Sequence, residues 1–292
     1  MISTAQFTVE QLTSSCGAIV HGVNVSQPQT PEQVAFIRRA LLDHGVIFFR
    51  GQEFTTQQHW DFGKQFGIPL KDEASGTPEN TAADVQAADL GPTRNSTAVW
   101  HADTTSLTRP PWGATLRPMK LPDVGGDTCF SSAQAAYEAL SEPWQRMLDG
   151  LTAVHHVDAL MERMGDFGPV YAESFLSNNP PSEVHPVVLT HPETGRKAIY
   201  VNEAFTTRIV ELEPAESKAV LQMLFRHMES PRFTLRWRWT LGDMVFWDNR
   251  SVQHYAVPDY ESGRVMERIV FLGIRPGGEG ADTAADKAMA AA

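Results

Sequence analysis

Short segments with strand patterns, and no regular alternation of strands with helices, most restrict the fold that this chain can adopt. Residues 46–49 form a continuous apolar run, and residues 233–239 alternate apolar with polar side chains. The first pattern is typical of a buried strand and the second of a strand with one buried face. We therefore predict a mainly β fold with peripheral helices and a double-layer jelly-roll (cupin-like) core, not a parallel sheet. Further strand patterns lie at 18–25, from 98 onward, and at 114–117, 244–247, 252–257 and 265–274.

Helix signals are fewer and lie between these strand segments. A Thr-Pro pair begins a predicted helix over residues 30–44, and a capping threonine begins a second over 55–66. Residues 214–229 carry apolar side chains on one side, which predicts an amphipathic helix. A short helix is expected over 132–140.

The length of 292 residues, with 42% hydrophobic residues, suits one large domain, which we assign to residues 1–276. Residues 67–97 and 158–184 are rich in polar residues, Gly and Pro without a period, so we predict long loops there. The second loop is interpreted as an active-site lid, with a surface insertion as the alternative. Residues 277–292 are expected to be a disordered tail.

Charge and composition exclude several classes of partner. The net charge is −11 and no basic run is present, so a nucleic-acid partner is not expected. No apolar stretch has the length of a membrane span, and Met1–Thr8 lacks the pattern of a secretory signal. Cys16 and Cys129 are the two cysteines; they could pair, but so few cysteines fit a reduced cytoplasmic protein.

Three side chains from two distant segments are candidate metal ligands. His101 and Asp103 are separated by one residue, and His254 lies far downstream. Two imidazoles and one carboxylate form the facial ligand set of mononuclear non-haem Fe(II) oxygenases, which leaves three metal positions open. Residues i and i+2 of a strand point to the same face, so we expect a strand to direct His101 and Asp103 toward one ion.

Two further residues extend this trio into a longer pattern. Thr128 follows Asp103 by some twenty-five residues, and Arg264 follows His254 by ten. With these residues the chain resembles the taurine dioxygenase-like (TauD/TfdA) family of Fe(II)/2-oxoglutarate-dependent dioxygenases, from about residue 17 to residue 273. The resemblance is densest in the segments 201–209, 236–239, 247–250 and 254–256.

The resemblance implies a double-stranded β-helix core and a role for each residue of the pattern. His101, Asp103 and His254 would bind Fe(II), and 2-oxoglutarate (α-ketoglutarate) and O2 would take the open positions. Arg264 and Thr128 would then bind the far carboxylate of 2-oxoglutarate, which a guanidinium fork matches well. By the same resemblance, Arg268 would bind an anionic group of the primary substrate. Residues i and i+4 of a strand share a face, so Arg264 and Arg268 could point into one cavity. Phe205 matches a substrate-contacting aromatic, although core packing explains it equally well.

The chain also departs from the taurine dioxygenase pattern. The segment 67–73 lacks the His and Tyr residues that taurine dioxygenases carry there. Thr97, which we place among the substrate-binding residues, stands where they have an asparagine, and Ser106 replaces an aromatic residue. A site without these hydrogen-bond partners discriminates poorly for the substrate that needs them. We therefore expect another sulfonate, an alkyl sulfate or an aryloxyalkanoate-like anion rather than taurine.

The predicted function is hydroxylation of a small anionic organic substrate, with 2-oxoglutarate converted to succinate and CO2. Two alternatives remain at this point. One is a non-catalytic jelly-roll protein that binds a 2-oxo acid, and the other is a Zn-dependent hydrolase that uses the same three ligands. We also expect a homo-oligomer, a dimer or a tetramer.

Overall fold

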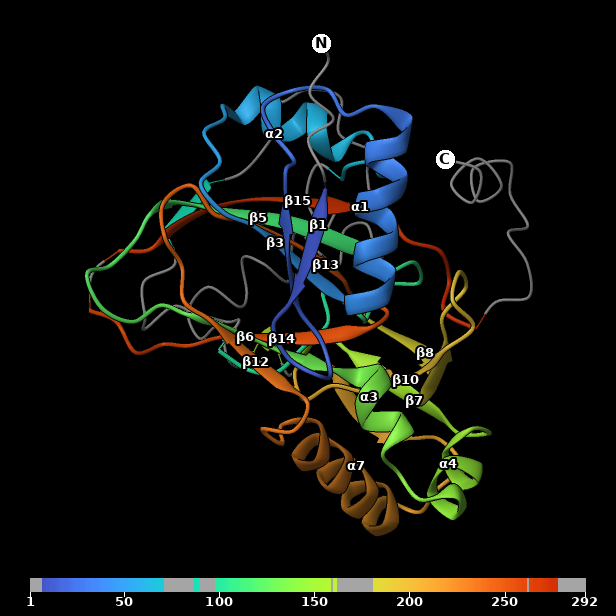
Figure 1. The fold of residues 1–292 in the computed structure, drawn as a ribbon. Coiled ribbons are helices and arrows are strands. Elements are labelled where there is room, and N and C mark those ends of the chain that lie inside the picture. Colours follow the sequence, from blue (N-terminus) through green and yellow to red (C-terminus); the bar gives the residue numbers. More distant parts are fainter. Residues whose placement is uncertain are drawn as a thin grey trace.

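The computed structural model describes residues 7–70, 87–89, 98–158, 160–161, 181–261 and 263–277. Its largest sheet has the strand order β1-β2-β3-β13-β5-β15-β4 (Figure 1). Strands β2 and β3 are parallel, whereas the other neighbours in this sheet are antiparallel. The strands of the sheet are β1 (Thr8–Gln11), β2 (Ala18–His21), β3 (Val46–Phe49), β4 (Ala87–Asp89), β5 (Gly113–Lys120), β13 (Met244–Asp248) and β15 (Val265–Phe271).

Smaller sheets face or flank the large one. The order β12-β6-β14 forms one of them, β11-β7-β8 a second, and β10-β9 a third. Their strands are β6 (Thr128–Ser132), β7 (Thr152–His156), β8 (Ser182–Pro186), β9 (Val188–Thr190), β10 (Lys197–Ile199), β11 (Thr206–Ile209), β12 (Thr234–Trp237) and β14 (Val252–Ala256). The helices are α1 (Pro31–His44), α2 (Thr56–Gly63), α3 (Ala133–Glu138), α4 (Glu142–Leu148) and α7 (Pro214–Met228).

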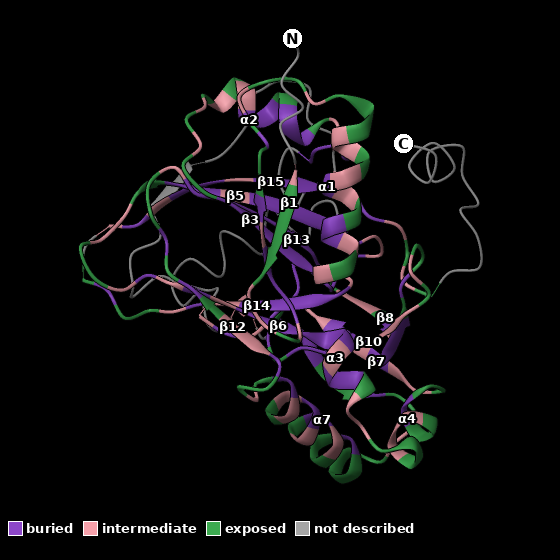
Figure 2. Ribbon diagram, viewed as in Figure 1, coloured by how far each residue is buried: buried purple, intermediate pink, exposed green. Residues whose placement is uncertain are grey.

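The apolar strands of the large sheet are buried on both faces (Figure 2). In β13, Met244 and Phe246 pack with the apolar sides of α1 and α2, whereas Val245 and Trp247 pack toward β6, β12 and β14. Successive side chains of a strand point to opposite faces, so a continuous apolar run serves two cores at once. The molecule is therefore layered as helices, large sheet and facing sheet, which agrees with the predicted mainly β fold with peripheral helices.

The predicted helices begin where the capping signals lie. Thr30 accepts a hydrogen bond from the Gln33 backbone N–H, and the Gln33 side chain accepts one from the Thr30 N–H. Such a capping box satisfies two backbone donors that a helix start leaves unpaired. Thr55 and Gln58 repeat this arrangement, although α2 ends at Gly63, three residues before its predicted end.

Several predictions need correction or fall wholly or partly outside the described residues. Residues 87–89 form strand β4, and residues 182–184 belong to β8, so neither predicted loop is irregular throughout. The strand expected from residue 98 onward is wrong, because residues 98–112 form turns and bends apart from one isolated bridge. Most of the predicted lid, Thr97 and the predicted disordered tail lie outside the described residues.

Cys16 and Cys129 are both free. Burial raises the pKa of the Cys16 thiol to about 11, so this thiol stays protonated near neutral pH. In the part of the chain that the structure describes, no helix has the length and apolar character needed to cross a membrane.

Candidate metal centre

The side chains of His101, Asp103 and His254 converge at one buried point. One ligand atom from each lies within 4.8 Å of the others. The Nε2 atoms of His254 and His101 lie 3.4 and 3.9 Å from Asp103 Oδ1. Within the described residues this is the one group of three or more His, Cys, Asp or Glu side chains close enough to hold a metal ion.

A bridge and a turn, rather than a regular strand, bring the two ends of the trio together. His101 and His254 exchange backbone hydrogen bonds of 3.0 and 2.8 Å in an isolated antiparallel bridge. Asp103 lies in the turn that follows, next to Thr104, whose φ of 42° is unusual for a β-branched residue. The convergence is as predicted, but the strand geometry offered as its reason is wrong.

His101 is held in a neutral form with a free Nε2 lone pair. Its Nδ1–H donates to the Val99 carbonyl over 2.7 Å, which leaves Nε2 as the unprotonated nitrogen. Burial, with a further contribution from His254, lowers the pKa of His101 to about 3. The ring therefore faces Asp103 with an electron pair available to a cation.

The Asp103 carboxylate is ionised and has two different oxygens. Burial acts to raise its pKa, but His254 and the Arg268 guanidinium outweigh this effect and hold the pKa well below its usual range. Its Oδ2 accepts a hydrogen bond of 2.9 Å from the Asn249 side chain, and its Oδ1 accepts one of 3.1 Å from Arg268. Oδ1 is the oxygen that faces the histidines.

Packing against aromatic rings orients His254. It lies on β14, with the Trp247 ring centroid 4.9 Å away and the Phe130 ring centroid 6.1 Å away. Its Nδ1 is buried without a hydrogen-bond partner among the described residues. The donor set of the site is thus two imidazole nitrogens and one carboxylate oxygen, which suits Fe(II) and requires no thiolate.

Arg264 is a buried cation without a carboxylate partner in the described parts of the chain. It is only 2% exposed, its Nη2 donates to Thr128 Oγ1 over 3.1 Å, and its Nε has no partner. Burial lowers the pKa of this guanidinium, whose nearest charged neighbours have weaker effects. Uncompensated buried charges are costly, so this position suits an anionic ligand.

Thr128 lies at the start of β6, and its hydroxyl completes the surroundings of Arg264. Thr128 Oγ1 accepts hydrogen bonds from Trp239 Nε1, at 3.0 Å, and from Arg264. A hydroxyl has two lone pairs and one hydrogen, so its hydrogen remains to be donated to a further acceptor. The backbone approaches closely here, because a Cβ on Gly126, where φ is +74°, would lie 3.2 Å from Arg264 Cδ.

Arg264 and Arg268 reach the interior from different backbone settings. Arg268 lies on β15, whereas Arg264 precedes that strand, and the pairing of β15 with β5 is irregular at Val265 and Met266. The prediction that one regular strand carries both arginines is therefore corrected. Phe205 is buried in a small cluster with Val99, beside the metal site, which fits the core-packing interpretation.

Two residues of the site were missed by sequence reasoning. Asn249 bonds to Asp103, and Trp239 bonds to Thr128. Trp239 was identified as part of an apolar strand face and of the resembling segment 236–239, but it was given no role in the site. Asn249 belongs to the segment 247–250 that carries the resemblance, and this is the signal that could have identified it.

Comparison with known proteins agrees with this geometry. Residues 8–270 match the family model described as taurine catabolism dioxygenase TauD, TfdA family. The chain is 36% identical to an alkylsulfatase of Acinetobacter baylyi, over 92% of this chain and 86% of that protein. It is 34% identical to an alpha-ketoglutarate-dependent sulfate ester dioxygenase of Pseudomonas putida, over 94% and 92% of the two chains.

The fold is similar to that of solved members of the family. The crystal structure of a taurine dioxygenase from Burkholderia xenovorans superposes with a TM-score of 0.78 at 34% identity, over 97% of this chain and 99% of that one. The predicted jelly-roll fold and the predicted His-Asp-His triad, consistent with Fe(II), are thereby confirmed. The chain belongs to the TauD/TfdA family of α-ketoglutarate-dependent dioxygenases.

Proposed function

We propose that His101, Asp103 and His254 bind the ferrous ion and that Arg264 with Thr128 binds the C5 carboxylate of 2-oxoglutarate. When bound, the iron supplies the redox chemistry that couples decarboxylation of 2-oxoglutarate to hydroxylation of a substrate C–H bond. The protein contributes a neutral His101 and an ionised Asp103, both buried, so that no proton must leave them when the metal binds.

The buried guanidinium of Arg264 is the observation that carries this proposal. Its neighbour Thr128 accepts two hydrogen bonds, so the Thr128 hydroxyl hydrogen and the Arg264 Nε–H both remain to be donated. The described residues supply no acceptor for the Arg264 Nε–H. A dicarboxylic co-substrate supplies that acceptor, because one carboxylate can reach Arg264 while the 2-oxo acid end reaches the metal. A Zn-dependent hydrolase gives no comparable reason for this arrangement. A passive 2-oxo-acid-binding protein would use the same anchor, and membership in a dioxygenase family is what speaks against it.

Arg268 is proposed to bind the anionic group of the primary substrate. Its side chain is 34% exposed, and its Nη1 contacts the metal-facing oxygen of Asp103, so it lies between the metal centre and solvent. A cation at this position holds a sulfate, sulfonate or carboxylate near the metal and leaves the adjoining carbon to face it. Phe205 and Thr97 are proposed to complete the substrate site.

We propose an alkyl sulfate ester as the preferred substrate class, since an alkylsulfatase and a sulfate ester dioxygenase, by name, are 36% and 34% identical to this chain over more than nine-tenths of its length. Hydroxylation of the carbon that bears the ester oxygen gives an unstable hemiacetal sulfate. This product collapses to an aldehyde, sulfate and a proton. Of the two oxygen atoms of O2, one enters the substrate hydroxyl and the other enters succinate, as 2-oxoglutarate is converted to succinate and CO2. Sulfonates and aryloxyalkanoates are the other candidates, and taurine is disfavoured for the reasons given from the sequence.

A substrate panel tests this proposal. The enzyme is incubated with Fe(II), 2-oxoglutarate and O2 together with hexyl sulfate, hexanesulfonate, taurine or 2-phenoxypropionate, and succinate and the aldehyde are quantified. Hexyl sulfate should give the highest kcat/KM. Equal or higher kcat/KM for taurine would contradict the proposed class.

Arg268→Met tests the proposed substrate anchor in the same assay. Loss of a charge-assisted hydrogen bond of about 1.5–3 kcal/mol should raise KM for hexyl sulfate roughly 10- to 100-fold. Arg39→Met is the matched control, because Arg39 is exposed on α1 and pairs only locally with Asp43. A KM in Arg268→Met as low as in Arg39→Met would refute the assignment.

The proposed setting of the enzyme is the cytoplasm, with a homo-oligomeric state. The buried free Cys16 and the absence of a disulfide between the two cysteines agree with a reducing compartment. Light scattering at micromolar concentration would measure the oligomeric state directly, and a monomer would contradict this part of the proposal.

A further inference from the structure

We propose that Asn249 is a positioning residue that holds the Asp103 carboxylate in one orientation, with Oδ2 occupied and Oδ1 presented to the metal. This inference rests on the proposed role of Asp103 as a metal ligand. Among the described residues, Asn249 makes hydrogen bonds with Asp103 but with neither histidine of the trio, so it acts on the metal site through Asp103. It is 3% exposed and lies at the turn between β13 and β14.

All hydrogen-bonding capacity of the Asn249 side chain is used. Its Nδ2 donates to Asp103 Oδ2 over 2.9 Å and to the Pro111 carbonyl over 3.2 Å. Its Oδ1 accepts from the Asp103 backbone N–H, at 3.2 Å, and from Trp247 Nε1, at 2.9 Å. A flipped amide would set its NH2 group against two donors, so these partners permit only one orientation.

The consequence for Asp103 is that its two oxygens are not interchangeable. Rotation of the carboxylate would break the Asn249 bond at Oδ2 and leave a buried amide donor unpaired, which costs about 1–3 kcal/mol. A freely rotating carboxylate could instead offer both oxygens to the metal and occupy a second coordination position. A metal site that must bind a 2-oxo acid through two oxygens and also O2 needs three open coordination positions. A carboxylate that offers only one oxygen to the metal keeps the third of these positions open.

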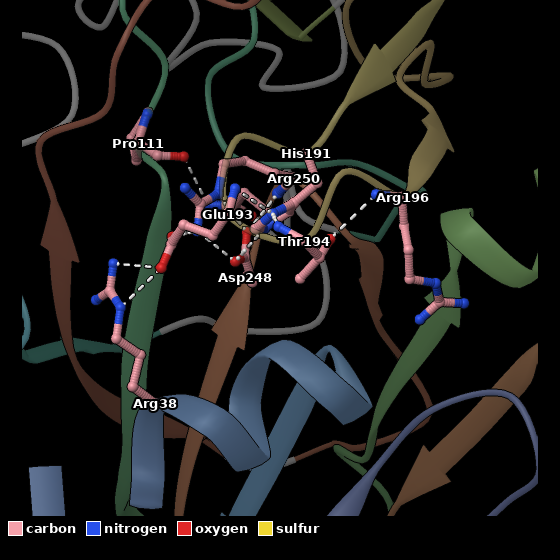
Figure 3. Close-up of polar contacts among 9 residues, drawn as sticks. Arg38, Pro111, His191, Glu193, Thr194, Arg196, Asp248 and Arg250 are labelled. Atoms are coloured by element: carbon pink, nitrogen blue, oxygen red, sulfur yellow. Dashed lines mark hydrogen bonds and ion pairs between the residues drawn. The ribbon is translucent and has the colours of Figure 1, made fainter. Parts of the chain in front are cut away.

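The backbone that carries Asn249 is supported by a partly buried ion-pair network (Figure 3). Arg250 donates two hydrogen bonds, of 2.8 and 2.6 Å, to the carboxylate of Asp248, and His191 Nε2 lies 3.0 Å from the same carboxylate. Arg250 also pairs with Glu193, which in turn pairs with Arg38 of α1. Both neighbours of Asn249 in the chain are therefore held in place.

Main-chain bonds add to this support. The Asn249 N–H donates to the Trp112 carbonyl over 2.9 Å, and the Ser251 N–H donates to the Asp248 carbonyl over 3.0 Å. Because both the side chain and its backbone are fixed, small displacements of the Asp103 carboxylate meet resistance. Groups that orient a metal ligand in this manner commonly change metal affinity 10- to 100-fold when they are removed.

Metal binding without turnover tests the role of Asn249. Metal-free wild type and Asn249→Ala are titrated with Mn(II), and free Mn(II) is followed by electron paramagnetic resonance. We expect the Mn(II) Kd to rise about 10- to 100-fold in Asn249→Ala. A second readout is the charge-transfer absorption of the anaerobic Fe(II)–2-oxoglutarate complex. At saturating metal this absorption should be weaker or shifted in Asn249→Ala compared with the wild type.

Asn202→Ala is the matched control. Asn202 is fully buried, donates to Thr105 Oγ1 over 2.9 Å and accepts from the Phe205 N–H over 3.0 Å, but within the described residues it makes no hydrogen bond with Asp103. Its loss should lower the melting temperature while the Mn(II) Kd stays unchanged. An equal rise of Kd in both variants would show a general effect of destabilisation and would overturn the proposal.

The outcomes separate this inference from the proposed function. His101→Ala should abolish Mn(II) binding; wild-type binding in that variant would refute the metal centre itself. If His101→Ala loses the metal but folded Asn249→Ala binds Mn(II) as wild type does, only the positioning role fails. If Asn249→Ala does not fold, Asn249→Ser takes its place, because the shorter serine side chain cannot reach Asp103 Oδ2. A wild-type Mn(II) Kd in that variant would likewise refute the positioning role.

Discussion

Replacement of Arg264 by methionine should weaken the binding of 2-oxoglutarate without lowering the stability of the protein. Methionine keeps an unbranched apolar side chain of similar length but removes the guanidinium, so the C5 carboxylate of 2-oxoglutarate would lose its cation. In most proteins the loss of a buried arginine weakens both binding and folding. Here the described residues supply Arg264 with one hydroxyl partner and no carboxylate, so folding has little to lose.

The expected magnitude follows from the burial of the site. Breaking a buried charge pair by removing one partner costs about 3–5 kcal/mol, which corresponds to a rise of roughly 150- to 5000-fold in the Kd for 2-oxoglutarate. The 2-oxoglutarate-free protein, by contrast, loses a buried cation whose desolvation outweighs the favourable electrostatic effects of Tyr260 and Asp127. Its melting temperature should stay the same or rise.

Isothermal titration with 2-oxoglutarate in the presence of Mn(II), together with thermal unfolding without 2-oxoglutarate, measures both quantities. Arg117→Met is the control, because Arg117 is buried but paired with Glu267 at 2.6 and 3.0 Å. That variant should lose about 3–5 kcal/mol of stability and keep its affinity for 2-oxoglutarate.

The reasoning about Arg264 is refuted by either of two results. Wild-type affinity for 2-oxoglutarate in Arg264→Met would remove the assigned anchor. A loss of stability as large as in Arg117→Met would show that Arg264 has a structural partner and that its charge is not reserved for a ligand.

Three further outcomes are expected. Gly126→Ala should destabilise the protein by about 1–3 kcal/mol and raise the Kd for 2-oxoglutarate, because φ is +74° there and the new Cβ would press on Arg264. Thermal unfolding and binding titrations measure both effects, and an unchanged melting temperature and Kd would contradict this expectation. Burial lowers the pKa of His155 well below 6.5, so the unfolded chain binds a proton near pH 6 that the folded protein does not, and the free energy of unfolding should fall as the pH drops below 6.5. Urea titrations at several pH values should show a shallower pH dependence of this free energy in His155→Phe than in the wild type. The same pH dependence in both proteins would exclude His155 as the source. Divalent metal should raise the melting temperature of the wild type through mass action, by an increment that chelation reverses and that His254→Ala lacks; the same increment in that variant would place the metal elsewhere.

Much of the fold could be predicted because its signals are local. The threonine caps at Thr30 and Thr55 determine where two helices begin, and the apolar runs 46–49 and 244–247 coincide with strands buried on both faces. Periodicity and capping act within a few residues, so they are readable from one chain. The strand expected from residue 98 onward does not form, because backbone pairing with His254 is limited to one bridge at His101 and the chain turns directly after it.

The chemical identity of the centre was likewise present in the sequence, since two imidazoles, one carboxylate and a downstream arginine are all that the reaction class requires. Their spacing did not show how they meet, and the strand argument for His101 and Asp103 was wrong in its geometry. Residue types specify which chemistry is available, whereas packing specifies the direction in which each group points.

Residue types and their local order thus determined the strand-rich fold class, the helix starts and the metal donor set of this protein. Tertiary structure alone decided that Asn249, 146 positions from Asp103, occupies one carboxylate oxygen, and that Arg264 is buried beside Thr128 without a carboxylate among the described residues. The physical reason is that hydrogen-bond partners and desolvation depend on which distant segments pack together, and no local pattern of the chain encodes that choice.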